Sequence, residues 1–373
     1  MVGFGFIGKV HAHAYRSIPL FYDPAPVTTR LVGVCTSRAE TAAKGVAQAG
    51  FEFGTTHFDE LLARDDIHII DVATPNHLHR PQIIAALEVG KHVYCDKPLT
   101  VTLDDARAIA AAARARPSLS HGMALQLRFV PATMRARQLI GDGFLGRVYH
   151  FRAAYLHAGY SDPSRPMSWR LSTEAGGGAL SDLGSHIIDL VRYLLGDVET
   201  VRGTTEIFVP ERPLPGRPDE RAPVEVDDYV CLQARMAGGA LGFVEASRFA
   251  TGTQDQAEFV IYGEQGALRF DLMDPNWLYA YDCRDAAGDL GGMRGFRQIE
   301  CVQRYPAPSA LPAPKLSVGW IRFHMHAVFD FLSAIAEGRL GACSLYDGAA
   351  TQAISDAVLR SADSGAWEPV PVV

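Results

Sequence analysis

The feature that most constrains this chain is a glycine pattern at its start, Gly3-Phe4-Gly5-Phe6-Ile7-Gly8. A G-x-G-x-x-G turn between a strand and a helix lets a dinucleotide pyrophosphate lie on the helix N-terminus. Gly3 permits the tight turn, Gly5 lets the backbone approach the phosphates, and Gly8 allows close packing of the helix on the strand. We therefore expect residues 3–8, with Phe6 and Ile7 between the glycines, to bind a dinucleotide cofactor.

The strand that should lead into this turn is nearly absent, because only Met1 and Val2 precede Gly3. A first strand of this kind is normally central in its sheet, so its loss removes backbone hydrogen bonds and part of the core. Two explanations are open. Either the natural start lies upstream of Met1, or other residues fill the gap.

The first third of the chain alternates helical patterns with apolar runs typical of buried strands, at residues 30–35, 67–73, 92–95 and 118–125. Such alternation predicts a parallel, doubly wound sheet with helices on its faces. We assign residues 1–124 to a dinucleotide-binding Rossmann domain of the α/β class, with a truncated first strand.

The pattern changes after residue 124. Helices are expected at 131–140 and 181–195, and a strand at 148–155. Five further strands, without intervening helices, are expected at 200–209, 229–236, 240–249, 257–262 and 267–272. Consecutive strands with short connections imply a mainly antiparallel sheet, so we assign residues 125–373 to an α+β domain. Two proline-rich stretches, 210–223 and 305–314, are interpreted as surface loops.

Composition limits the binding partners and the cellular compartment that we expect for this protein. The net charge is −7 and the 35 Lys and Arg residues are scattered, which argues against nucleic acid or an anionic membrane as a partner. No apolar run approaches the ~20 residues of a membrane span, and we expect no signal peptide because the N-terminus enters the glycine turn at once. The six cysteines are dispersed, as expected for reduced thiols in a cytoplasmic protein.

The residues after the second strand bear on cofactor choice. NAD sites usually place Asp or Glu there, but this chain has Cys35-Thr36-Ser37-Arg38 and no acid before Glu40. A hydroxyl beside a guanidinium suits a 2′-phosphate, so Ser37 and Arg38 favour NADP over NAD. The alternative is that both residues cap the next helix and face solvent.

Two later strands end in polar motifs at the sheet edge where ligands bind, Thr74-Pro75-Asn76 and Asp96-Lys97-Pro98. Asn76 and His79 would reach the ribose or the nicotinamide, unless the first motif is an ordinary strand-to-helix turn. Lys97 would stabilise a developing alkoxide. Lys91 is interpreted as a surface charge.

Asp182 and His186 form the strongest constellation of the second half. They stand four residues apart after three consecutive glycines, at 176–178, hence on one face of a helix with an open start. A histidine of ordinary pKa takes a hydroxyl proton near neutral pH. The alternative is an acid at a helix N-terminus and a core histidine. No metal is expected, because the H-x-H pairs lack zinc-like partners.

In order and spacing these motifs resemble the Gfo/Idh/MocA oxidoreductases over nearly the whole chain. The resemblance implies a Rossmann domain followed by an α+β domain whose large open sheet mediates homodimers or homotetramers. It also implies reversible NAD(P)-dependent oxidation of a secondary alcohol on a sugar, a cyclitol or a related polyhydroxy compound.

The resemblance further implies roles for single residues. Lys97 polarises the reacting oxygen, Asp182 binds or orients the substrate, and His186 shuttles the hydroxyl proton. Asp96, which would contact the cofactor, replaces the family's usual Glu with a shorter carboxylate of the same charge. Three further residues fall near positions that line the family's active site: Arg128, Trp169 and Arg170.

Two other functions fit the same fold. One is a non-catalytic NADP-binding regulator, which would not need a proton-shuttling pair. The other is a redox-assisted lyase, epimerase or glycosidase that recycles its cofactor within each turnover.

Overall fold

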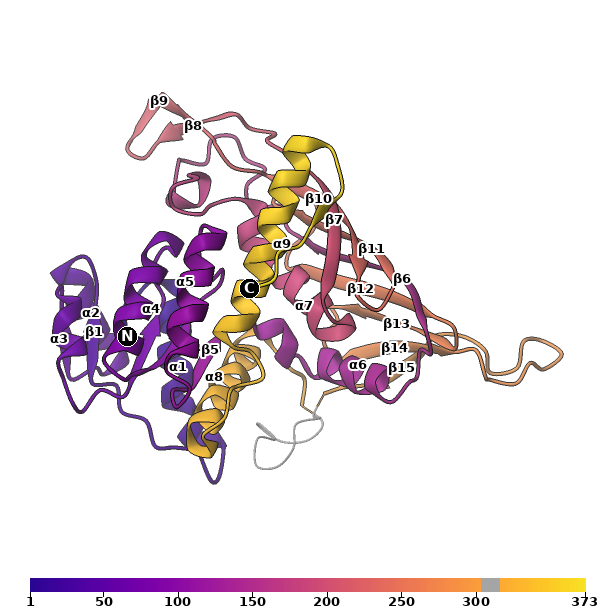
Figure 1. Cartoon of the computed structure of the whole chain (residues 1–373), viewed down its shortest axis with the longest axis horizontal. Coiled ribbons are helices and arrows are strands. Elements are labelled where there is room, and N and C mark those ends of the chain that lie inside the picture. Colours follow the sequence, from indigo (N-terminus) through magenta and orange to yellow (C-terminus); the bar gives the residue numbers. More distant parts are fainter. Residues whose placement is uncertain (303–315) are drawn as a thin grey trace.

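The computed structural model describes residues 1–302 and 316–373, so the predicted loop 305–314 lies outside the described residues. Two bodies stand side by side, a helix-rich N-terminal one and a second one built on a broad sheet, with the last helices between them (Figure 1). None of the described helices combines the length and apolarity that a membrane span needs.

The first body confirms the predicted alternation of parallel strands and helices. Strands β1 and β2 pair in parallel, as do β3, β4 and β5. Its elements are α1 (Phe6–Phe21), β1 (Gly33–Cys35), α2 (Ala39–Ala49), β2 (Phe53–Thr55), α3 (Phe58–Leu62), β3 (Ile69–Val72), α4 (His79–Glu88), β4 (His92–Cys95), α5 (Leu103–Arg114) and β5 (His121–Met123).

Residues 1–3 join the two halves of this sheet. Val2 forms parallel bridges to Cys35 on one side and to Val72 on the other. Its N–H donates to the Asp71 carbonyl at 2.7 Å, and the Cys35 N–H donates to the Met1 carbonyl at 2.9 Å. Met1 and Val2 are buried. Met1 and Val2, the two residues before the turn, therefore supply backbone pairing between β1 and β3.

The second body is a nine-stranded sheet in the order β15-β14-β13-β12-β6-β11-β10-β7-β16. Every neighbouring pair is antiparallel except β6 with β11, which confirms the mainly antiparallel prediction. Its strands are β6 (Val148–Leu156), β7 (Val198–Glu206), β10 (Tyr229–Met236), β11 (Leu241–Ser247), β12 (Gln256–Gly263), β13 (Gly266–Asp271), β14 (Trp277–Asp282), β15 (Arg297–Glu300) and β16 (Glu368–Pro369).

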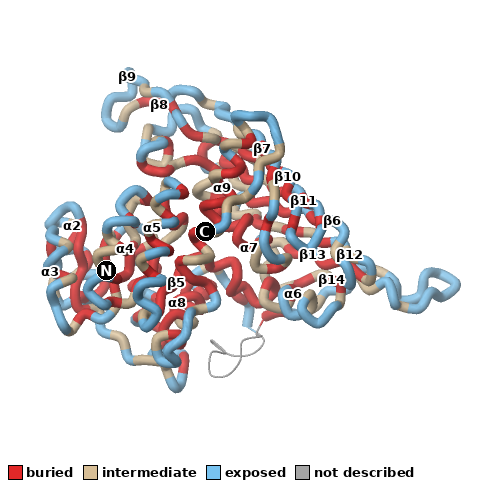
Figure 2. Tube along the Cα trace, viewed as in Figure 1, coloured by how far each residue is buried: buried red, intermediate tan, exposed pale blue. Residues whose placement is uncertain are grey.

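Three helices pack against this sheet: α6 (Pro131–Gly141), α7 (Ser185–Leu195) and α9 (Leu345–Ser364). A fourth, α8 (Trp320–Glu337), packs against the first body. Helix α9 contacts both α5 and β7, whereas α8 packs on α1. Buried residues run along these contacts (Figure 2). The C-terminal helices therefore complete the hydrophobic core of the N-terminal body, to which Ala327, Leu345 and Ala349 contribute.

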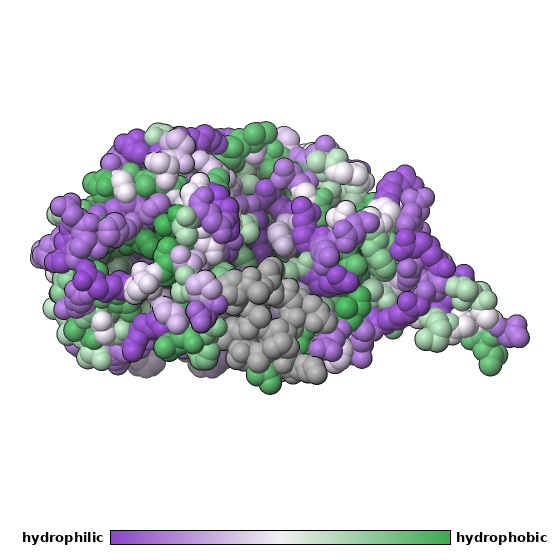
Figure 3. Space-filling view, turned by 90° about the horizontal axis from the view of Figure 1, so that it is seen from below, coloured by the Kyte–Doolittle hydropathy of each residue, from purple (hydrophilic) through white to green (hydrophobic). Residues whose placement is uncertain are grey.

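One predicted loop forms a hairpin instead. Residues 210–223 were expected to be a loop but form β8 (Glu211–Leu214) and β9 (Arg217–Pro223), which pair antiparallel. Between β14 and β15 an arm projects far from the sheet, with apolar atoms near its end (Figure 3). Leu290 on this arm is 100% exposed and Met293 77% exposed.

Candidate active site

A cavity of about 980 Å³ lies at the carboxyl edge of the parallel strands, where the two bodies meet. Most of the predicted site residues line it, whether they come from the N-terminal body or from the second one. The predicted residues that lie outside its lining are Gly8, His79 and Arg128.

The glycine turn fits a dinucleotide. Gly3 has φ +91°, and a Cβ there would lie 2.3 Å from the Ala73 carbonyl oxygen. At Gly8 a Cβ would lie 2.5 Å from the Gly3 carbonyl oxygen, so this glycine allows α1 to pack against the turn. A Cβ on Gly5 would meet no atom within 4 Å. Gly5 therefore faces open space at the N-terminus of α1, where a pyrophosphate is stabilised by free N–H groups and the helix dipole.

The residues after β1 form the other end of this cofactor groove. Ser37 and Arg38 are exposed and line the cavity, while the Thr36 hydroxyl donates to the Arg38 carbonyl at 2.7 Å. The acidic residues of the lining are Asp96, Asp182 and Asp255, and none of them follows β1. Within the described residues, no carboxylate therefore stands where NAD-selective sites place one.

The Thr74–Asn76 segment lines the cavity but is held by the protein itself. The Asn76 amide is 4% exposed and donates to the Gly176 carbonyl at 2.7 Å, which ties the sheet edge to the second body. His79 is fully buried. Its Nε2 lies 2.9 Å from the Thr74 carbonyl oxygen and its Nδ1 3.1 Å from that of Pro98. His79 therefore links the loop after β3 to the loop after β4, from a position outside the cavity.

Lys97 and Asp182 meet inside the cavity. The Lys97 ammonium donates to Asp182 Oδ1 at 2.8 Å and to the Asp182 carbonyl at 2.7 Å. The buried Arg248 guanidinium lies 3.3 Å from Asp182 Oδ2. Burial by itself would raise the pKa of Asp182, but Lys97 and Arg248 hold it well below its usual range. Asp182 is therefore a carboxylate at every physiological pH.

His186 lies beside this pair. The chain enters helix α7 through a π-helical segment, Leu180–Gly184, and His186 follows on the first turn of α7. Its side chain is buried and its Nδ1 has no hydrogen-bond partner among the described residues. Burial first, and then the positive charge of Lys97, lowers the pKa of His186 well below its ordinary value. The imidazole is thus neutral at pH 7 and able to accept a proton.

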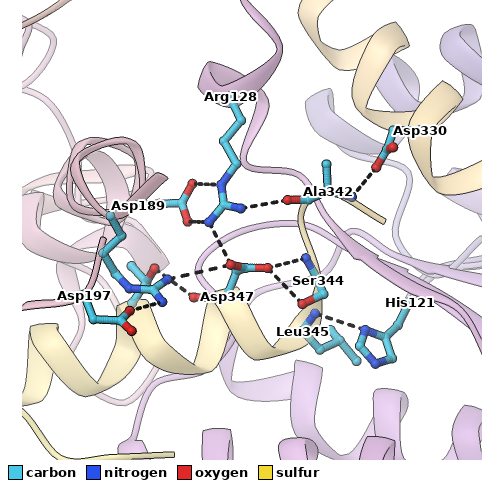
Figure 4. A network of polar contacts seen from close by, with 11 residues as sticks. His121, Arg128, Asp189, Asp197, Asp330, Ala342, Ser344, Leu345 and Asp347 are labelled. Atoms are coloured by element: carbon cyan, nitrogen blue, oxygen red, sulfur yellow. Dashed lines mark hydrogen bonds and ion pairs between the residues drawn. The ribbon is translucent and has the colours of Figure 1, made fainter. Parts of the chain in front are cut away.

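Arg128 has a different place from the one that the resemblance implied. Its guanidinium forms a bidentate pair with Asp189, through Nε at 2.7 Å and Nη2 at 2.5 Å. It also donates to Asp347 at 2.9 Å and to the Ala342 carbonyl at 2.8 Å (Figure 4). These bonds link α7 to the start of α9. Arg128 therefore holds the second body to the C-terminal helices.

Lys91 was interpreted as a surface charge, and this was wrong. It is 6% exposed, and its ammonium donates to the carbonyls of Arg64 at 2.9 Å and Ile67 at 2.7 Å.

In the described part of the chain, no three His, Cys, Asp or Glu residues are grouped as metal ligands would be.

Several cavity residues escaped the sequence reasoning. They are Gln126, Tyr155, His157, Arg248, Asp255, Trp320 and His324. The Tyr155 hydroxyl donates to Asp255 at 2.6 Å, across 100 residues of sequence. Only His324 carried a signal, as part of an H-x-H pair. The others are single polar or aromatic residues without a local pattern.

The comparisons with known proteins agree with this geometry. Residues 1–121 match a family model described as an oxidoreductase family with an NAD-binding Rossmann fold, and residues 133–269 match a GFO/IDH/MocA C-terminal domain. Levoglucosan dehydrogenase from Pseudarthrobacter phenanthrenivorans is 36% identical over all of this chain and 98% of its own length. The chain belongs to the Gfo/Idh/MocA oxidoreductase family.

Solved structures support the same assignment. Levoglucosan dehydrogenase in complex with NADH and levoglucosan superposes with a TM-score of 0.94 at 37% identity, covering 100% of this chain and 98% of the other. An oxidoreductase domain protein from Kribbella flavida gives 0.93 at 39% identity, with 99% and 98% coverage. This member of the family is thus an oxidoreductase with a nicotinamide-dinucleotide-binding Rossmann fold, as predicted.

Proposed function

We propose that the chain oxidises a secondary alcohol of a neutral sugar or related polyhydroxy compound, with Lys97, Asp182 and His186 at the reacting carbon. The observation that carries the proposal is their meeting in one cavity with the Gly3–Gly8 turn. The levoglucosan dehydrogenase structures support the substrate class, since their complexes contain levoglucosan or L-sorbose together with NADH. In this proposal residues 1–124 hold the cofactor and residues 125–373 supply most of the substrate contacts.

The residues divide the chemistry among them. A bound nicotinamide dinucleotide would accept the hydride that leaves the carbinol carbon. Neutral His186 takes the hydroxyl proton as general base. An ammonium group has three N–H donors, and Asp182 occupies two of those on Lys97. The third is available to stabilise the negative charge that develops on the substrate oxygen. Asp182 holds the lysine in this orientation.

The far wall of the cavity suits hydroxyl groups. Tyr155 and Asp255 present a hydroxyl–carboxylate pair, and Trp169 offers an aromatic surface beside Arg170. Arg248 is fully buried and already bonded to the carbonyls of Arg170 and Gly178. Arg248 is therefore engaged by the protein itself, and the Tyr155–Asp255 pair and Arg170 are left to hydrogen-bond the hydroxyl groups of a polyol.

For the cofactor we propose that NADP(H) is preferred to NAD(H). Arg38 and Ser37 both line the cavity, and Arg38 forms no ion pair with another described residue. The next carboxylate along the chain, Glu40, pairs with Lys44 instead. The relatives with bound NADH make NAD(H) the necessary comparison. In Arg38→Gln, NADPH should bind about tenfold more weakly while NADH is unaffected, because one charge-assisted contact is lost at an exposed site. Equal changes for both cofactors would contradict this preference.

We further propose that the open face of the sheet forms a homodimer or homotetramer interface. Leu241, His150 and Tyr262 face one another across β11, β6 and β12, and Leu241, Phe243 and Tyr262 are each about two fifths exposed. Exposed apolar rows of this kind mark interaction sites. The Phe243→Glu variant should lower the mass measured by light scattering, and an unchanged mass would exclude this face.

The proposed activity is tested by incubating the protein with NAD⁺ or NADP⁺ and a panel that includes levoglucosan, L-sorbose, aldoses and cyclitols. Reduced cofactor should accumulate with at least one neutral polyol. Product formation without net cofactor reduction would indicate a redox-assisted lyase or epimerase instead. Tight cofactor binding without turnover of any compound would refute the dehydrogenase assignment.

A further inference from the structure

The catalytic end of the cavity contains a second histidine, His324, that the proposed mechanism does not use. It lies on α8, is 2% exposed, and borders the cavity together with Trp320, whose ring centroid is 4.3 Å from its own. Neither of its ring nitrogens has a hydrogen-bond partner among the described residues. Buried polar groups are almost always satisfied, so this imidazole is poised for a ligand.

His324 lies between the glycine turn and the catalytic pair. On one side, the ring of Phe6 stacks on that of Trp320 with centroids 5.6 Å apart. On the other side, His324 is within electrostatic reach of Lys97 and His186. A dinucleotide bound with its pyrophosphate on the turn and its reactive carbon at Lys97 would have its nicotinamide ring close to His324.

We propose that His324 hydrogen-bonds the carboxamide group of the nicotinamide ring. A neutral imidazole has one donor and one acceptor, and the carboxamide has an NH₂ donor and a carbonyl acceptor, so the two groups are complementary. This assignment rests on the proposed function, because it requires that the cavity binds a nicotinamide dinucleotide.

The surroundings keep this imidazole uncharged. Burial, followed by the charges of His11 and Lys97, lowers the pKa of His324 well below its ordinary value. The His11 ring lies behind it, 6.2 Å away between centroids, and pairs with Asp71 at 2.9 Å. A neutral partner matters here because the oxidised nicotinamide ring carries a positive charge, which an imidazolium would repel.

The competing role for His324 is a contact to the substrate. Two probes separate the roles: NADH, and ADP-ribose, which has the adenosine and pyrophosphate but no nicotinamide. The test variants are His324→Leu, which removes both hydrogen-bonding atoms, and His324→Gln, which keeps a donor and an acceptor. His157→Leu serves as a matched control, since His157 also borders the cavity but directly follows β6 of the second body.

Dissociation constants are measured by calorimetry without substrate, with melting temperatures recorded for each variant. We expect H324L to bind NADH about tenfold more weakly, the equivalent of ~1.4 kcal/mol, and ADP-ribose with unchanged affinity. H324Q should recover most of the loss, and H157L should bind both ligands normally.

Three results would overturn the inference: equal weakening of NADH and ADP-ribose in H324L, no weakening of either, or an equal NADH loss in H157L. Failure of the wild-type protein to bind NADH or NADPH would instead refute the proposed function.

Discussion

Replacing Lys97 by Met tests the catalytic proposal most directly. The substitution removes the ammonium with little change in side-chain length, and with it the one N–H that the two bonds to Asp182 leave for the substrate. Loss of a single donor to a developing oxyanion costs about 2.7–4 kcal/mol, or about 10²–10³ in kcat. The expected result is a fall of that size in kcat with NAD(P)H affinity within about threefold of wild type.

The same variant has a second readout in its pH profile. Lys97 is one cause of the low pKa of His186, so its removal should raise that pKa and move the acid limb of kcat/KM to higher pH. Lys91→Met is the matched control. It removes a lysine that also donates two hydrogen bonds, here to the carbonyls of Arg64 and Ile67, and that lies outside the cavity. The variant should therefore lower stability and leave kcat unchanged. A K97M enzyme that keeps more than about a tenth of kcat would refute the role of Lys97.

Three further outcomes are expected. Arg128→Met should lower the free energy of unfolding by about 3–5 kcal/mol in chemical denaturation, because buried Asp189 loses its partner; a change below about 1 kcal/mol would contradict this. Burial lowers the pKa of His121 to about 4, so that on acidification the unfolded state binds the proton before the folded state does. The free energy of unfolding should therefore decline as the pH falls from ~6.5 toward 4, and it should decline less steeply in His121→Asn. Gly5→Ala should keep the wild-type melting temperature but bind NADH weakly, because its Cβ enters open space at the phosphate site. Gly8→Ala should have a lower melting temperature and also bind NADH weakly, because its Cβ would collide with the Gly3 carbonyl oxygen.

Much of the fold could be predicted because it leaves periodic signals. Thr102, with Asp105 three residues on and an alanine-rich run behind it, is a typical N-terminal helix cap, and it accepts a hydrogen bond from the Asp105 N–H at 3.2 Å where α5 begins. The alternation of apolar and polar residues along β10 and β11 likewise appears as alternating burial. Such patterns survive because they depend on neighbours within a few residues.

Other parts were not predictable in this way. The β8–β9 hairpin has four prolines and mostly exposed residues, so its composition is that of a loop. Residues 1–3 were too few to be recognised as a strand. In the structure Val2 nevertheless forms one β-bridge to the strand on each side, to Cys35 at the end of β1 and to Val72 at the end of β3. Here the partner strands, far along the sequence, decided the structure.

The sequence alone determined the chemistry-bearing motifs: the Gly3–Gly8 turn, Lys97 at a strand end, and the Asp182/His186 spacing. Each depends on local geometry, in which residue type and spacing fix where a group points. Only the tertiary structure decided what surrounds them. It paired Arg128 with Asp189 and placed Asp255 against Tyr155. It also left the ring nitrogens of His324 without a hydrogen-bond partner among the described residues. These contacts join segments tens to hundreds of residues apart, and burial and pairing across such distances leave no pattern in a single sequence.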